Sequence, residues 1–259
     1  MIAQMVLGGR TLLRGLQLLS QPGIRQYVVI PLILNIALFG AGIWYIHGWL
    51  QKIFDWIDGF LPSWLHWLQW LLVPLLVIAV AITLFSLFSM LLNLVAAPFN
   101  SLLAEQVEYQ QTGRFATGKP ITMQSLLADT APLLWGELNK ILYALLWMIP
   151  FLLLFIIPVV NVVAPLFWIL YSTWMLAIQY MDIPMNNHAL NGRQVRQTLR
   201  QKRALSMGFG GMTLLLTSLP FVNFLAMPAA VAGATLLWLE QFAQEQPTPD
   251  TGEKPFARS

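Results

Sequence analysis

The chain has 259 residues, of which 58% are hydrophobic and only 10% are charged. Because soluble domains carry about 25% charged residues, this balance excludes an ordinary soluble protein and predicts an integral membrane protein. The absence of cysteine excludes disulfides, iron–sulfur clusters and thiol catalysis. Basic loops at a membrane surface explain the formal net charge of +3 more simply than nucleic-acid binding does.

The first 26 residues combine a helix with a capped helix start. Residues 1–20 carry apolar positions around Arg10 and Arg14, which predicts a short amphipathic helix on the membrane surface. In the stretch 20–26, Ser20-Gln21-Pro22-Gly23-Ile24-Arg25-Gln26, we expect Ser20 to cap the next helix. The free amides of Gly23, Ile24 and Arg25, the positive end of the helix dipole and a guanidinium would then form an anion site. Its candidate residues are Ser20, Gly23, Ile24, Arg25 and Gln26. The alternative is a plain cap with Arg25 as an interfacial anchor.

Two long uncharged runs follow, at residues 27–50 and 71–103. Each exceeds the roughly 20 apolar residues that cross a bilayer, so each predicts a transmembrane helix. The tryptophan-rich segment 51–70 between them predicts an interfacial turn and helix. Polar residues in apolar runs usually face the bundle interior or a wet path. We therefore expect candidates for a permeation path at Asn35, Asn93, Asn100 and Glu105. The alternative for Glu105 is a structural ion pair with an arginine.

A mixed segment at 104–140 predicts amphipathic cytoplasmic extensions. The second half of the chain then contains a repeat, in which Pro158 to Pro165 recurs as Pro220 to Pro228. Each copy interrupts an apolar run and predicts a helical hairpin with a Pro/Asn corner, inserted fully or partly in the membrane. We expect Asn161 and Asn223 to satisfy backbone groups at these tips. The alternative is two ordinary tight turns on the far surface.

Basic residues are concentrated between the two hairpins. Four of them recur at spacings that place them on one face of a helix: Arg193, Arg196, Arg200 and Arg203. They indicate either a basic vestibule for anions or a membrane-surface and orientation signal. With both termini in the cytoplasm, every lysine and arginine except Lys52 falls on the cytoplasmic side. The sequence thus predicts one helical membrane domain over 1–245, with a flexible tail at 246–259.

Several of these motifs occur in register in a known family. Residues 20–25, 97–100 and 102–106, together with 174–180 and the residues Asp182, Pro184, Asn187 and His188, resemble the CysZ-type sulfate permeases of bacteria. The likeness extends from about residue 15 to 240. It implies a multi-pass inner-membrane protein that brings sulfate into the cytoplasm for cysteine synthesis, as a channel or a proton-coupled permease. The family's sulfate motif falls on Gly23, Ile24 and Arg25, and Gln26 stands where relatives often have a second arginine.

The partners expected from the sequence are sulfate, sulfite or other oxyanions, membrane lipids and further copies of the chain, but no nucleic acid, metal or cofactor. No hydrolase, metalloprotease or P-loop motif is present, so we do not expect an enzyme. The alternative function is a non-transporting membrane scaffold or assembly protein whose basic faces bind lipids or a partner.

Overall fold

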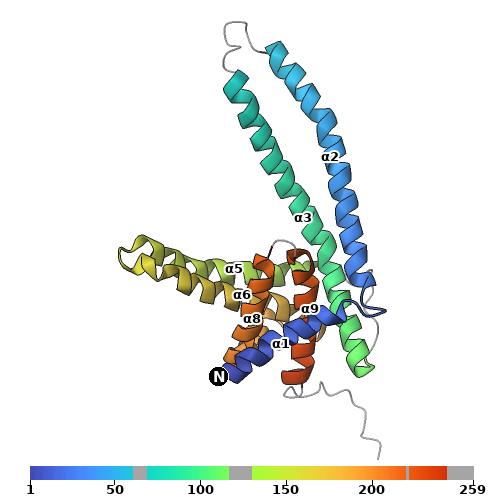
Figure 1. Cartoon of the computed structure of the whole chain (residues 1–259), viewed down its shortest axis with the longest axis vertical. Coiled ribbons are helices and arrows are strands. Elements are labelled where there is room, and N and C mark those ends of the chain that lie inside the picture. Colours follow the sequence, from blue (N-terminus) through green and yellow to red (C-terminus); the bar gives the residue numbers. More distant parts are fainter. Residues whose placement is uncertain (61–68, 117–129, 220–221, 244–259) are drawn as a thin grey trace, which may run out of the picture. The chain divides into compact units, whose positions relative to one another are not determined.

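The computed structural model describes residues 1–60, 69–116, 130–219 and 222–243. Within these ranges the chain is helical and has no strand, which confirms the all-α class. In chain order the helices are α1 (Ile2–Leu18), α2 (Gln26–Phe60), α3 (Gln69–Thr112), α5 (Thr130–Ile156), the short 3-10 helix η2 (Val160–Val162), α6 (Ala164–Asn187), α7 (Gly192–Gln201), α8 (Arg203–Ser218) and α9 (Asn223–Gln241) (Figure 1).

Three helices contain stretches long and apolar enough to cross a membrane, among the residues that the structure describes. They are Gln26–Trp44 in α2, Leu138–Ile156 in α5 and Asn223–Gln241 in α9. These three stretches support a helical membrane protein. The count of two long transmembrane helices plus two inserted hairpins stays a prediction. α2 continues to Phe60 without the interfacial turn expected after residue 50. The rest of that expected segment, 61–68, lies outside the described residues.

The described residues group into two compact units. Gln26–Phe99 forms one unit, which holds α2 and most of α3. Met1–Arg25 and Asn100–Ser259 form the other, which holds the last turns of α3 and the remaining helices. The single domain expected over 1–245 stays a prediction. The tail expected at 246–259 lies outside the described residues, as does part of the cytoplasmic extension, at 117–129.

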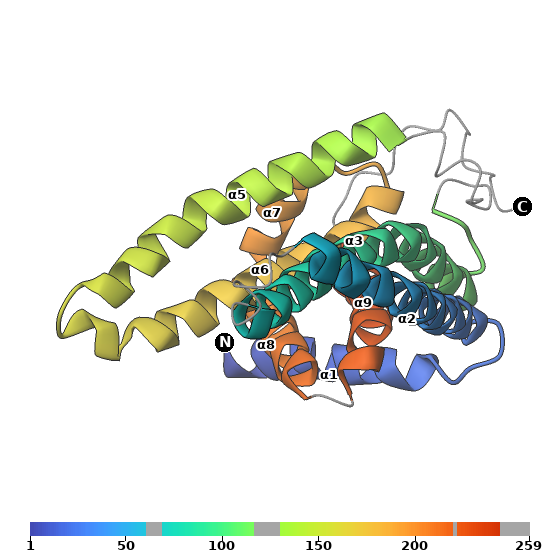
Figure 2. The same ribbon diagram turned by 90° about the horizontal axis from the view of Figure 1, so that it is seen from above.

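Glycines allow α1 to pack closely across α8 and α9 (Figure 2). A Cβ added at Gly8 would overlap the carbonyl oxygen of Leu205 in α8, and one at Gly15 would overlap the backbone of Gly233 in α9. Such close backbone contact is typical of helices that associate in membranes. The helix predicted for residues 1–20 is therefore present. One of its faces packs against α8 and α9, and Leu12 is fully buried.

Aromatic side chains hold α5 and α6 together as an adjacent pair (Figures 1 and 2). The rings of Phe151 and Tyr171 lie 5.1 Å apart between centroids. The hydroxyl of Tyr171 donates a hydrogen bond to the carbonyl oxygen of Ala144 at 2.8 Å. The corner between the two helices contains η2, and α8 and α9 form a second pair.

The two copies of the Pro/Asn repeat form different local structures. Asn161 lies inside the 3-10 turn before α6, whereas Asn223 is the first residue of α9. Both side chains are exposed, and neither makes a hydrogen bond within the part of the chain that the structure describes. The expectation that these asparagines satisfy backbone groups at buried tips is therefore wrong. The backbone N–H of Asn161 donates to the carbonyl oxygen of Ile157, and the backbone N–H of Asn223 donates to that of Leu219. The helical turns therefore satisfy this backbone without the asparagine side chains.

Candidate anion-binding site

The stretch that follows α1 is a turn, not the first turn of a helix. α1 ends at Leu18 and α2 begins at Gln26, so the helix does not start directly after the cap expected at Ser20. The amides of Ile24 and Arg25 both donate to the carbonyl oxygen of Gln21, each at 3.2 Å. The expectation of three free amides is thus wrong for two of them. Within the described ranges, the Gly23 N–H has no backbone acceptor and stays available to a ligand.

Two glutamines of α3 reach this turn. The Gln110 carboxamide donates to the carbonyl oxygen of Pro22 at 2.9 Å. A Cβ added at Gly23 would lie 2.9 Å from Gln110 Nε2 and 3.7 Å from Gln106 Nε2. Residues four apart on a helix lie on one face, which explains why both carboxamides reach the same glycine. Each carboxamide nitrogen carries two N–H donors, so Gln110 has one left after its bond to Pro22.

The side chains of the turn divide into an anchor and exposed donors. Ile24 is fully buried, so its side chain fixes the turn to the protein and only its backbone can meet a ligand. Ser20 and Arg25 are exposed, and Arg25 makes no ion pair with any described residue. Gln26 is the first residue of α2 and is also exposed. The turn thus offers a hydroxyl, a guanidinium and carboxamides but no carboxylate, a set suited to an anion.

Replacing Gly23 with alanine is expected to weaken oxyanion binding about tenfold without unfolding the protein. The new methyl group would meet the Gln110 carboxamide, and the φ of +89° at this position disfavours any residue with a Cβ. Loss of one aligned hydrogen-bond donor costs up to about 1.5 kcal/mol, and about 1.4 kcal/mol corresponds to a tenfold change in affinity. Calorimetric titration with sulfate in detergent measures the change. Gly40→Ala is the control, since nothing lies within 4 Å of a Cβ there. Equal sulfate affinity in both variants contradicts the prediction.

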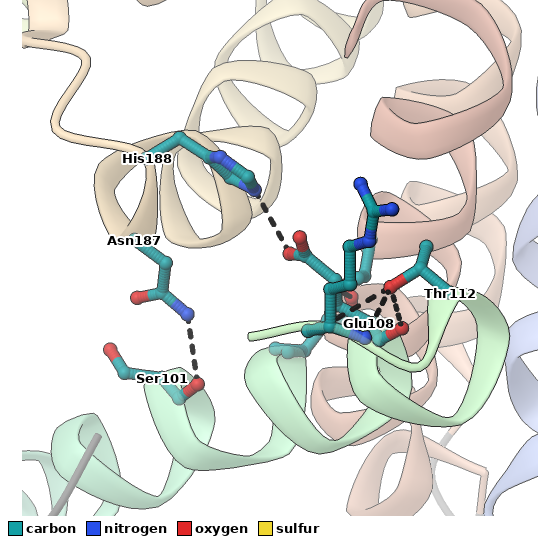
Figure 3. Close-up of polar contacts among 8 residues, drawn as sticks. Ser101, Glu108, Thr112, Asn187 and His188 are labelled. Carbon is teal, nitrogen blue, oxygen red and sulfur yellow. Dashed lines mark hydrogen bonds and ion pairs between the residues drawn. The ribbon is translucent and has the colours of Figure 1, made fainter. Parts of the chain in front are cut away.

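Buried carboxylates lie on the last turns of α3 and on α6. Glu108 Oε2 lies 2.9 Å from His188 Nε2, and the Asn187 carboxamide donates to the carbonyl oxygen of Ser101 at 3.0 Å (Figure 3). Asp182 Oδ2 accepts from Lys140 Nζ at 2.9 Å. These contacts give a physical role to the 182–188 motif noted in the sequence, because its polar side chains tie α6 to α3 and α5.

The structure describes two of the four candidates for a permeation path. The Asn100 carboxamide lies 3.6 Å from the sulfur of Met227 in α9. Glu105 is only 4% exposed and has an interaction partner, so both the path and the structural ion pair stay open for it. Asn35 and Asn93 belong to α2 and α3, but their side chains lie outside what the structure describes.

The predicted single face of four arginines is broken by a change of helix. α7 ends at Gln201 and α8 begins at Arg203, and Lys202 between them has non-helical backbone angles of φ −122° and ψ 55°. Arg196, Arg200 and Arg203 nevertheless come close to the same aromatic wall of α5 and α6. Arg193 does not take part in that arrangement and is exposed.

Sequence reasoning missed Gln106 and Gln110, although both were visible in the chain. Gln106 closes the motif at 102–106, and Gln110 follows it by four residues. The spacing alone could have placed them on one helix face. It could not indicate that this face meets the turn, because Gln110 and Pro22 are 88 residues apart in the chain.

The helices and the turn together define an all-helical protein with candidate membrane spans and a donor-rich, carboxylate-free turn. A sequence model of the family described as sulfate transporter CysZ/etoposide-induced protein 2.4 matches residues 11–228. The chain is also similar to the sulfate transporter CysZ of Pectobacterium atrosepticum, with 42% identity over 229 residues, which are 88% of this chain and 82% of that protein. The chain therefore belongs to the CysZ family, and the resemblance noted in its sequence is confirmed.

Proposed function

We propose that this protein carries sulfate across the bacterial inner membrane into the cytoplasm, where the sulfate supplies cysteine synthesis. The observation that carries the proposal is the family match over residues 11–228, since it includes the turn, the end of α3 and the 182–188 motif. The relative with 42% identity is named a sulfate transporter. Membership of a transporter family also argues against an enzyme.

The chemistry of the turn supports sulfate as the ligand. Sulfate at neutral pH is a dianion that only accepts hydrogen bonds, and phosphate keeps a proton that prefers an acceptor. The proposed site consists of Ser20, the backbone of Gly23 and Ile24, and the side chains of Arg25 and Gln26. We add Gln106 and Gln110, whose carboxamides lie beside Gly23. Sulfite and other oxyanions without a proton are proposed as competitors.

Asn100 and Glu105 are proposed to lie on the path from this site, because polar groups placed in apolar helices usually face other helices or water. Asn35 and Asn93 are retained from the sequence alone. Transport by a channel and transport coupled to protons both fit these residues. We further propose a homo-oligomer, because the exposed apolar side chains of α5 and α6 need cover from lipid or from another copy of the chain.

Sulfate flux into liposomes that contain only this protein tests the function. We expect radiolabelled sulfate to enter faster than in empty liposomes and phosphate to compete poorly. Sulfate flux equal to that of empty liposomes, from protein shown to be folded and inserted, would instead favour the membrane scaffold.

Replacing Arg25 with alanine is expected to weaken sulfate binding about 10- to 100-fold. A charge-assisted hydrogen bond contributes about 1.5–3 kcal/mol, and Arg25 is the cation of the turn. Calorimetric titration at fixed ionic strength gives the affinity. Arg10→Ala removes the same charge from an exposed position on α1 and serves as the control. If Arg25→Ala binds sulfate like the unmodified protein, the proposed site is wrong, whether or not sulfate flux is found.

A further inference from the structure

A hollow of about 380 Å³ lies between α5, α6 and the segment where α7 meets α8. Tyr143 and Trp147 of α5 and Trp174 of α6 form part of its aromatic wall, and Arg200 and Arg203 also line it. Its size falls within the usual range for small-molecule sites, about 300–1,000 Å³. The lining residues include two cations and no carboxylate. The hollow is therefore suited to an anionic group attached to an apolar body.

Arg196 adds a third guanidinium next to this wall. Its central carbon lies 4.5 Å from the centroid of the Tyr143 ring, in a cation–π contact. The Tyr143 hydroxyl is in turn 3.4 Å from Trp174 Nε1. Arg196 Nη1 is buried and has no hydrogen-bond partner among the described residues. A buried donor without an acceptor is unfavourable, so this nitrogen is suited to an acceptor that the described residues do not supply.

None of the three arginines is compensated by an acid within the described ranges. The ion pairs of Arg14 with Glu240, Lys140 with Asp182 and His188 with Glu108 lie within these ranges, and none of them includes one of the three arginines. Arg196 and Arg200 are one helical turn apart on α7, and Arg203 follows at the start of α8. A phosphate group can accept from several guanidinium groups at once, in paired hydrogen bonds.

The hollow also lies next to a helix suited to lipid. The apolar stretch Leu138–Ile156 of α5 has none of its residues buried inside the protein. Tyr143 and Trp147 belong to this stretch and also line the hollow. Tyrosine and tryptophan favour the membrane–water interface, and basic pockets between membrane helices bind lipid headgroups. Figure 2 shows α7, which carries two of the arginines, beside α5.

From these observations we infer that the hollow is a binding site for an anionic phospholipid. The lipid phosphate is held by Arg196, Arg200 and Arg203, and its acyl chains lie along the apolar surface of α5 and α6. A free sulfate or phosphate would use the arginines but would gain nothing from the aromatic wall. The site is separate from the turn at residues 20–26 and does not depend on the proposed transport of sulfate.

Native mass spectrometry of the full chain in detergent, titrated with phosphatidylglycerol, tests this inference. We expect Arg200→Gln to weaken binding of one phosphatidylglycerol about fivefold, and the triple change of Arg196, Arg200 and Arg203 to glutamine to weaken it about 100-fold. Arg193→Gln removes an equal charge from the same helix but away from the hollow, and we expect it to leave binding unchanged. Phosphatidylcholine, which has no net charge, is expected to bind weakly to every form.

Two results would overturn the inference. One is an equal loss of phosphatidylglycerol binding in Arg193→Gln and Arg200→Gln, which would indicate a diffuse charge effect. The other is displacement of the lipid by inorganic phosphate at a similar concentration, which would indicate a free-anion site. Should the triple variant fail to fold, Arg200→Gln decides the matter alone, because Arg200 is exposed and makes no ion pair with a described residue.

Discussion

Replacing Gly8 with alanine is expected to destabilise the protein by about 3 kcal/mol, the upper end of the usual effect of overpacking. The new methyl group would overlap the carbonyl oxygen of Leu205 and would lie 2.8 Å from the amide nitrogen of Phe209. Both are backbone atoms inside α8, so they cannot move aside as a side chain does. α1 would have to separate from α8, and the buried surface around Leu12 would be lost.

The neighbouring change Gly9→Ala is the matched control. Its methyl group would lie 3.4 Å from the end of the Met212 side chain and 3.6 Å from the carbonyl oxygen of Gly208. The methionine can adjust, and alanine favours the helix by about 1 kcal/mol over glycine, so this variant should be as stable as the unmodified protein or slightly more so. Unfolding in detergent, followed by circular dichroism, compares the two. Similar midpoints for both variants would show that α1 does not pack on α8 through Gly8.

Replacing Asp182 with leucine is expected to destabilise the protein by about 3–5 kcal/mol, since it removes a buried carboxylate that is bonded to the largely buried ammonium of Lys140. The Lys140 Nζ to Asp182 Oδ2 distance is 2.9 Å, and the two side chains are 17% and 6% exposed. Burial strengthens the attraction between the charges, but it also makes an uncompensated ammonium costly.

A double-mutant cycle separates this pair from general damage to the core. We expect Lys140→Met combined with Asp182→Leu to be less destabilising than the two single changes added together, because the two side chains share one ion pair. The exposed pair of Arg14 and Glu240, with side chains 50% and 35% exposed, is the comparison. Glu240→Gln should cost no more than about 1 kcal/mol. If the two single changes at Lys140 and Asp182 simply add in the double variant, the pair is not coupled.

The sequence by itself determined the class of the protein and the approximate positions of several of its helices. Long apolar runs and scarce charges require a helical membrane protein, because each backbone polar group in lipid must be paired within its own helix. The helix near the N-terminus, the long helices after residues 26 and 69 and the helices on either side of the first Pro/Asn corner all occur where local patterns indicate them. Matching motifs along the chain also identified the family and drew attention to Gly23 and Arg25.

Only the tertiary structure decided what these elements contact. The helix start predicted at Ser20 is a turn, because the carbonyl oxygen of Gln21 accepts hydrogen bonds from the backbone N–H groups of Ile24 and Arg25. The residue preferences of helix caps do not determine which of these two structures forms. Gln106 and Gln110 meet Gly23, and three arginines meet an aromatic wall, through contacts between distant parts of the chain. Periodicity records which residues share a face of one helix, but the partner of that face depends on how the backbones approach. Here glycines such as Gly8 and Gly15 permit the close approach of the backbones, which a hydropathy pattern does not predict.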